Sequence, residues 1–212
     1  KGLSLPLSAV NALRRSVLDG LSSKRQAPPR RQRGVFVPGV PMENRKGPPR
    51  LLFSLSRMEQ LTRELLSLSP AQIYLPVSEA AKNLPKLEAF LAAGAPLSVS
   101  MPRVVWDDQW PALLSDLDRV RSAGVSSALT GNLGQIRPLA DRGFTLRGDF
   151  GLNIYNSEAL KELRRLNFVS ATLSFELRFP QIRDLSKCLD TEILVYGRLP
   201  LMVMENCVIQ NR

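Results

Sequence analysis

The chain has 212 residues, 44% of them hydrophobic, and a formal net charge of +10 from 29 Lys and Arg against 19 Asp and Glu. This content can bury one sizeable core, but no stretch approaches the roughly 18 uninterrupted apolar residues of a membrane span. There is no histidine, which excludes Ser-His and Cys-His pairs and His-Glu-x-x-His zinc sites within this chain. The two cysteines make no disulfide framework, so we expect a reducing, cytoplasmic location and no membrane partner.

The positive charge is concentrated at the start of the chain. Residues 1–50 hold eleven Lys and Arg against two acidic residues, whereas the remainder holds 18 against 17. We therefore expect two parts: an N-terminal helix with a basic, Pro-rich arm over residues 1–50, and a folded domain over residues 51–212. Prolines interrupt both Lys24–Arg33 and Arg45–Arg50, which predicts an extended linker in each.

Basic side chains of this arm are candidate contacts for RNA phosphates, since such contacts add affinity without reading sequence. The alternative is a solvated linker, because Phe36 is the one aromatic residue among the charges. The candidates are Lys24, Arg25, Arg30, Arg31 and Arg33.

From residue 51 onward, short apolar runs alternate with amphipathic stretches. The runs predict strands at 51–55, 72–77, 97–101, 126–130, 145–148, 170–175 and 192–196. Between them the 3.6-residue period and the Ser, Asp and Asn caps predict helices at 57–67, 78–92, 110–123, 133–142, 157–166 and 179–188. Repeated βα units without a Gly-x-Gly-x-x-Gly fingerprint favour an α/β fold of the (β/α) TIM-barrel type, incomplete or open because an eighth strand is not visible.

Active sites of such barrels lie where the strands end. Polar residues stand at or after the ends of five of the predicted strands, and we expect Asn153, Glu176, Tyr196 and Arg198 to converge. Candidate catalytic residues are Glu176, Tyr196 and Arg198; candidate substrate-binding residues are Asp149, Asn153, Asn156 and Gly197.

Each candidate also has a purely structural interpretation. The asparagines, Asn132 included, and Asp149 are typical helix caps or turn residues. Glu176 and Arg198 could form a surface ion pair of little energetic worth. Tyr196 could pack with its hydroxyl toward solvent.

The last part of the sequence, Thr191 to Cys207, resembles the signature of the collagenase-like peptidase family of unassigned catalytic type. Glu192, Gly197, Leu199, Cys207 and Ile209 match the signature, while Pro200 replaces a family cysteine. The run from Gly197 to Met202 with Asn206 and Cys207 is similar to one branch of the family. Segments 5–15, 149–153 and 173–177 resemble stretches of the family in general, although Phe175 replaces a proline.

The resemblance implies a barrel-based fold and a position in the C-terminal part of a longer polypeptide, whose N-terminal family domain would be a partner. Some family members are implicated in hydroxylating bases of ribosomal and transfer RNA, so the resemblance implies a part in RNA base hydroxylation. A peptidase and a non-catalytic scaffold remain alternatives. The resemblance also implies an iron-sulfur cluster, because related members hold one on four cysteines. Cys207 could bind such a cluster only together with cysteines outside this chain. Cys188 is instead expected in the core, on a helix.

Overall fold

The computed structural model describes residues 4–28, 34–35, 37, 43–44, 47–200, 203–204 and 209. The chain divides into two units, Lys1–Val40 and Pro41–Arg212, each described by itself. The first contains α1 (Leu7–Gln26), a helix none of whose residues is buried. Lys24 and Arg25 lie in its last turn, so the extended linker predicted from Lys24 onward is wrong at these residues. The helix ends at Gln26 because Ala27, which precedes Pro28, takes an extended conformation. Arg30, Arg31 and Arg33 lie outside the described residues.

The second unit is built on a parallel sheet whose spatial order equals its chain order. Its seven strands are β1 (Leu52–Ser54), β2 (Gln72–Pro76), β3 (Leu97–Ser100), β4 (Ser127–Thr130), β5 (Thr145–Gly148), β6 (Phe168–Thr172) and β7 (Asp190–Glu192). Each strand pairs in parallel with the next. The sheet is curled but open, since β1 and β7 are its two edges. The predicted incomplete barrel is confirmed.

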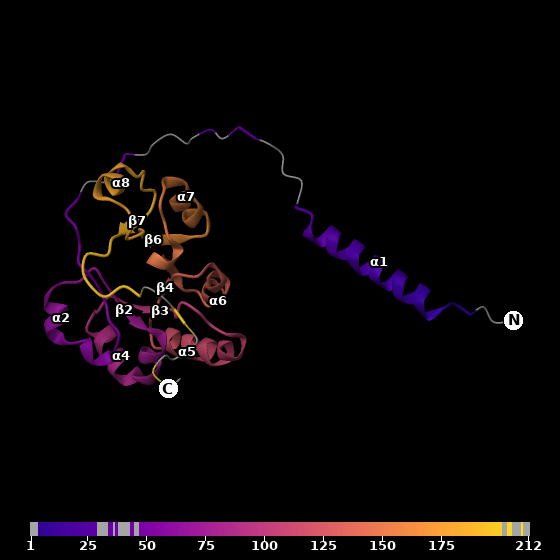
Figure 1. Ribbon diagram of the computed structural model, residues 1–212. Helices are drawn as coiled ribbons and strands as arrows, with labels where there is room; N and C mark the ends of the chain where they lie inside the picture. Colours follow the sequence, from indigo (N-terminus) through magenta and orange to yellow (C-terminus); the bar gives the residue numbers. More distant parts are fainter. Residues whose placement is uncertain are drawn as a thin grey trace. The chain divides into compact units, whose positions relative to one another are not determined.

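Helices connect consecutive strands and surround the outer face of the curl (Figure 1). They are η1 (Met58–Gln60), α2 (Arg63–Ser67), α3 (Val77–Lys82), α4 (Leu84–Ala92), η2 (Asp107–Gln109), α5 (Trp110–Ser122), η3 (Leu133–Gln135), α6 (Ile136–Ala140), η4 (Phe150–Leu152), α7 (Ser157–Arg165) and α8 (Phe179–Asp184). The single helix predicted over 78–92 is two helices that meet at Asn83, because Pro85 lies in the first turn of α4 and proline is favoured only at such a start.

The prediction for the last strand is wrong in its position and burial. β7 ends at Glu192, and the apolar residues that follow are 44%, 40% and 81% exposed at Ile193, Leu194 and Val195. The physical reason is the open edge. Among the described residues no further strand pairs beyond β7, so the chain leaves the sheet before its apolar run, which stays partly exposed.

Side chains of each strand alternate between the helices and the interior of the curl. Those that face the helices, such as Ile73, Leu75, Val99 and Ala171, belong to one apolar core with buried residues of the helices. The alternate positions are polar in nearly every strand and include Gln72, Tyr74, Ser98, Ser127, Arg147, Ser170 and Glu192. The apolar core therefore lies between sheet and helices, while the inside of the curl is a polar compartment.

The segment that precedes β1 joins the two edges of the sheet. The Asn44 amide donates from Nδ2 to the Leu185 carbonyl at 2.7 Å and accepts from the Lys187 amide at 2.8 Å. Arg50 pairs with Asp190 of β7 at 3.4 Å. This part of the predicted arm is thus attached to the domain.

Candidate functional site

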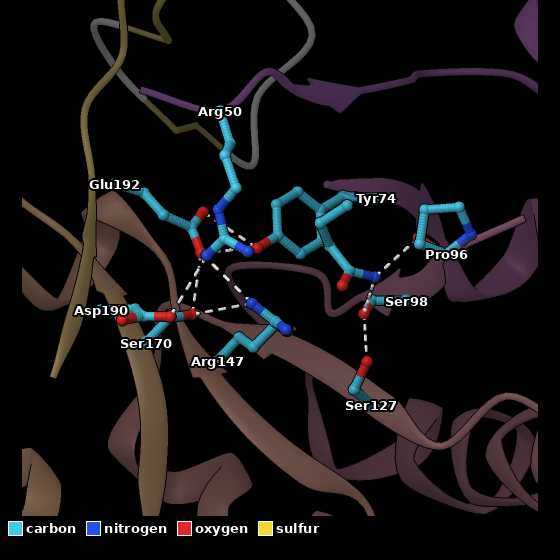
Figure 2. A network of polar contacts seen from close by, with 10 residues as sticks. Arg50, Tyr74, Pro96, Ser98, Ser127, Arg147, Ser170, Asp190 and Glu192 are labelled. Atoms are coloured by element: carbon cyan, nitrogen blue, oxygen red, sulfur yellow. Dashed lines mark hydrogen bonds and ion pairs between the residues drawn. The ribbon is translucent and has the colours of Figure 1, made fainter. Parts of the chain in front are cut away.

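Four residues from four strands meet inside the curl, and we call them the interior network: Tyr74, Arg147, Ser170 and Glu192 (Figure 2). The Tyr74 hydroxyl donates to both carboxylate oxygens of Glu192, at 2.8 and 2.9 Å. Ser170 donates to Oε1 of the same carboxylate at 2.8 Å. Arg147 donates from Nη1 to the Ser170 hydroxyl at 3.1 Å and lies 3.6 Å from Glu192 Oε1. Glu192 is thereby held by hydrogen bonds from two other strands and by an ion pair from a third.

The polar contacts continue beside the network. Gln72 donates from Nε2 to the Pro96 carbonyl at 2.7 Å and to the Ser98 hydroxyl at 2.6 Å. The hydroxyls of Ser98 and Ser127 are hydrogen-bonded to each other (Figure 2). These bonds satisfy polar groups that would otherwise be buried at a cost of about 1–3 kcal/mol each.

The electrostatics of the network keep the Tyr74 phenol protonated. Burial raises the pKa of Tyr74 well above its usual range, and the negative charge of Glu192 with its hydrogen bond raises it further. Arg147 opposes this shift only in part. Tyr74 is therefore a fixed hydrogen-bond donor across the neutral range, and the network serves to position groups rather than to move this proton.

A second group of residues lies at the carboxyl ends of the strands, in the loops that follow β3, β5 and β6. We call Arg103, Phe150 and Phe175 the rim cluster. The Arg103 guanidinium carbon lies 5.2 Å from the centroid of the Phe150 ring, and the Phe150 and Phe175 rings meet edge to face at 6.0 Å and 62°. Phe175 is 47% exposed, and Phe179, at the start of α8, is 73% exposed. Aromatic faces and a cation are thus presented together at the end of the barrel where active sites lie.

Asp149 lies at the end of β5, next to the rim cluster. Its Oδ1 accepts a hydrogen bond from the Phe150 amide at 2.8 Å, and its own amide donates to the Thr130 carbonyl at 2.8 Å. Desolvation raises the pKa of Asp149 and the Glu192 charge also raises it, while the Phe150 amide and Arg103 act in the opposite direction. A half-buried carboxyl with a raised pKa at a strand end is suited to proton transfer.

A close approach of two loops fixes the backbone around Asp149. A Cβ added to Gly151 would lie 3.0 Å from the Gly131 carbonyl oxygen and 3.2 Å from the Gly131 Cα. A cavity of about 690 Å³ opens beside these glycines, lined by Arg103, Asn132 and Leu163 among others. The rim therefore combines a rigid backbone, a hollow and the Asp149 carboxyl.

The capping interpretation of the predicted site residues is confirmed for three of them. Asn132 accepts from the Gly134 amide at 2.9 Å, Asn156 accepts from the Ala159 amide at the start of α7 at 2.8 Å, and Asp149 caps η4. Asn153 ends η4 in the left-handed conformation, with a φ of 51°. Two of these residues contact the rim cluster: Asp149 accepts from the Phe150 amide, and Asn132 donates from Nδ2 to the Arg103 carbonyl at 3.3 Å.

The other predicted residues are placed differently. Glu176 accepts a hydrogen bond from the Tyr155 hydroxyl, and no ion pair joins it to Arg198 among the described residues. Tyr196 is 99% exposed, and Gly197, with a φ of 140°, and Arg198 are exposed beside it. The strand predicted to run to residue 196 ends at Glu192. Tyr196, Gly197 and Arg198 therefore do not lie at the end of a strand. Their part in catalysis or binding stays a prediction.

The described residues do not fit an iron-sulfur cluster. Cys188 is half-buried against the core and follows α8 rather than lying on it. Cys207 lies outside the described residues, and within the described part of the chain no group of three or more His, Cys, Asp or Glu residues could hold a metal ion. We therefore derive no chemical step through such a cluster.

The interior network is the part of the site that sequence reasoning missed. Its signal was the two-residue alternation in the strands, where Gln72 and Tyr74, or Asp190 and Glu192, put polar groups on one face. Strands covered on both faces normally form continuous apolar runs. Polar residues at every second position therefore indicated a polar interior, but not which side chains pair across it.

Fold and site together define a (β/α)-barrel-like domain with a polar interior and an aromatic, partly cationic rim. The chain belongs to peptidase family U32, whose model matches residues 82–212, more than half of the chain. This confirms the family resemblance of the Thr191–Cys207 segment. The solved structure of the U32 peptidase Mk0906 aligns with a TM-score of 0.52 at 15% identity, covering 73% of this chain and 72% of that one, which supports the fold.

No curated protein matches the sequence. Within the described part of the chain, no helix has the length and apolar character needed to cross a membrane.

Proposed function

We propose that this domain binds RNA within an enzyme that hydroxylates RNA bases. The observation that carries the proposal is the rim cluster, in which the Phe150 ring contacts both Arg103 and Phe175. Proteins that hold single-stranded nucleic acid combine aromatic faces, on which bases stack, with cations that follow the backbone.

The exposure of the rim aromatics supports this use. Phe175 and Phe179 leave 47% and 73% of their surface to solvent, an unfavourable arrangement that a stacked base would relieve. They lie in the βα connections, where barrels bind their substrates. Within the domain the acidic and basic residues nearly balance, so local placement of cations such as Arg103 would direct an RNA strand to this end.

The Asp149 carboxyl is the group of the proposed site that would contact the edge of a bound base. A base stacked on Phe175 would lie beside the end of β5, where burial raises the pKa of the Asp149 carboxyl above its usual value. Enzymes that modify bases take the base out of its stack and hold it between apolar side chains. Asp149 would then accept or donate a hydrogen bond at the edge of the base.

Binding of single-stranded RNA to the wild-type chain and to Phe175→Ala, measured by fluorescence anisotropy, tests the proposal. Loss of one stacking platform should weaken binding by about 5- to 100-fold, since one stacked base contributes about 1–3 kcal/mol. The matched control is Leu68→Ala, because Leu68 is 55% exposed but precedes β2 at the other end of the strands. Equal affinities for wild type and Phe175→Ala would overturn the proposal.

The family's description makes proteolysis the second candidate. Without histidine, a peptidase on this domain would need a carboxylate pair, a serine activated by lysine, or residues outside this chain; Asp149 is the candidate carboxylate. Incubation with an extended, collagen-like peptide separates the two functions. Cleavage that is abolished by Asp149→Asn and insensitive to Phe175→Ala would favour the peptidase.

A further inference from the structure

A pocket of about 400 Å³ opens at the amino ends of the strands, opposite the rim cluster. We call it the amino-end pocket. Its wall includes the residues before β1, the first residues of β1, β2 and β7, and two residues of the interior network. The residues that matter for binding are Arg50, Gln72, Arg147, Asp190 and Glu192.

Arg147 provides the pocket with a cation whose hydrogen-bonding capacity is not used up. Its described bonds come from Nη1, while its Nε is buried without an acceptor. The nearest carboxylate, Glu192, already accepts from Tyr74 and Ser170 and lies 3.6 Å from Nη1. The side chain is 23% exposed, so the outer edge of the guanidinium can bind an anion. A planar carboxylate can bind such an edge through two parallel hydrogen bonds.

Asp190, at the mouth of the pocket, provides a negative charge that complements Arg147. Asp190 pairs with Arg50 at 3.4 Å, and their side chains are 61% and 70% exposed (Figure 2). An exposed pair of this kind contributes about 0–1 kcal/mol, so Asp190 can exchange Arg50 for a ligand cation at little cost. Two cations and two carboxylates line the pocket, a balance that disfavours a dianion and suits a ligand with one charge of each sign.

We propose that the amino-end pocket binds a free α-amino acid, with the ligand carboxylate on Arg147 and its ammonium group on Asp190. Gln72, 6% exposed, supplies a fixed amide beside the ligand. The site lies at the opposite end of the strands from the rim cluster, so the inference does not depend on RNA binding.

The test is a thermal-shift screen of the standard L-amino acids at millimolar concentration, followed by calorimetry on those that stabilise the protein. The carboxyl amide and the N-acetyl derivative of each such amino acid are titrated in parallel. We expect saturable binding of at least one amino acid and about tenfold or greater loss for both derivatives, since each lacks one of the two charges. Absence of saturable binding across the screen, or equal binding of the amide, would overturn the proposal.

Variants assign the binding to the pocket. Arg147→Met should weaken binding at least about tenfold and Arg147→Lys by less, because Lys keeps the charge but not the planar edge. Arg137→Met is the matched control, since Arg137 is 91% exposed on α6. Asp190→Asn should weaken binding of the amino acid and leave the N-acetyl derivative unchanged. If Arg147→Met fails to fold, the comparison of amino acid with amide on the wild-type chain decides; unchanged binding by a folded Arg147→Met would contradict the assignment.

Discussion

The hydroxyl of Tyr74 in β2 lies 2.8 and 2.9 Å from the two carboxylate oxygens of Glu192 in β7, 118 positions away along the chain. The two strands do not pair, since β7 is one edge of the sheet and β2 is next to the other. Side-chain hydrogen bonds across the interior, rather than a ladder of backbone bonds, therefore join the two ends of the curl.

Tyr74→Phe should destabilise the domain by about 1–3 kcal/mol, because Glu192, whose side chain is 11% exposed, keeps its charge but loses a donor. The free energy of unfolding in urea measures the effect. Tyr155→Phe is the matched control: it also removes a phenol that binds a carboxylate, but Tyr155 and Glu176 are both exposed, so the change should stay within about 0.5 kcal/mol. Similar losses in both variants would contradict a special role for the interior network.

The domain should lose stability above the usual pKa of tyrosine, about pH 10. Burial and Glu192 raise the pKa of Tyr74 in the folded state, so the folded protein holds this proton more tightly than the unfolded chain does. The resulting stabilisation is complete below about pH 10 and decreases by up to about 1.4 kcal/mol per pH unit above it. Unfolding measured from pH 8 to 11 should show a smaller alkaline slope in Tyr74→Phe than in the wild type; equal slopes would show that another group is responsible.

Asp149→Asn should make the domain more stable relative to wild type at neutral pH than at acid pH. Desolvation raises the folded-state pKa of Asp149, so the folded protein binds this proton more tightly than the unfolded chain does. The stabilisation of the wild type that results is complete at acid pH and is lost as the pH rises through the folded-state pKa. The asparagine does not titrate and can still accept from the Phe150 amide. Urea unfolding of both proteins across this pH range measures the difference, and a difference independent of pH would refute the explanation.

Gly151→Ala should cost about 1–3 kcal/mol of stability and weaken RNA binding, because the new Cβ would lie 3.0 Å from the Gly131 carbonyl oxygen and force the two loops apart. Gly47→Ala provides the comparison, since nothing lies within 4 Å of a Cβ built there. Thermal unfolding and RNA anisotropy measure both effects. A stable Gly151→Ala variant would mean that the loops can separate freely.

Replacing Arg30, Arg31 and Arg33 by Gln should make the salt dependence of RNA binding shallower. Each phosphate contact to a single strand contributes about 0.7 to the slope of log K against log salt, so three lost contacts should lower it by about 2. The control replaces Arg57, Arg63 and Arg137, three exposed arginines of the barrel-like domain. An unchanged slope in the first variant would assign the phosphate contacts to other residues.

The sequence predicted the architecture well because the architecture depends on local patterns. Strand β5 occurs at the predicted residues 145–148, and the others shift by a few residues at their ends. The errors arise where tertiary context decides. The apolar run after Glu192 has the composition of a buried strand, but it follows an edge with no partner.

The candidate site was less predictable for the same reason. Asp149 could be placed at a strand end from its position after the 145–148 run, whereas its contact with Phe150 and its proximity to Glu192 depend on the curl of the sheet. Tyr74 and Glu192 each occupy an inward position on their strand, but their meeting requires the two ends of the sheet to approach, which residue periodicity does not encode.

The open edge of the sheet has a consequence for how the domain meets other chains. An exposed parallel edge normally invites strand addition and aggregation. Here β1 and β7 are only three residues long each, and Arg50 and Asp190 place charges beside them. A strand of another chain would find few backbone groups to pair with and would have to displace these charges. The sheet can therefore stay open without promoting edge-to-edge association between chains.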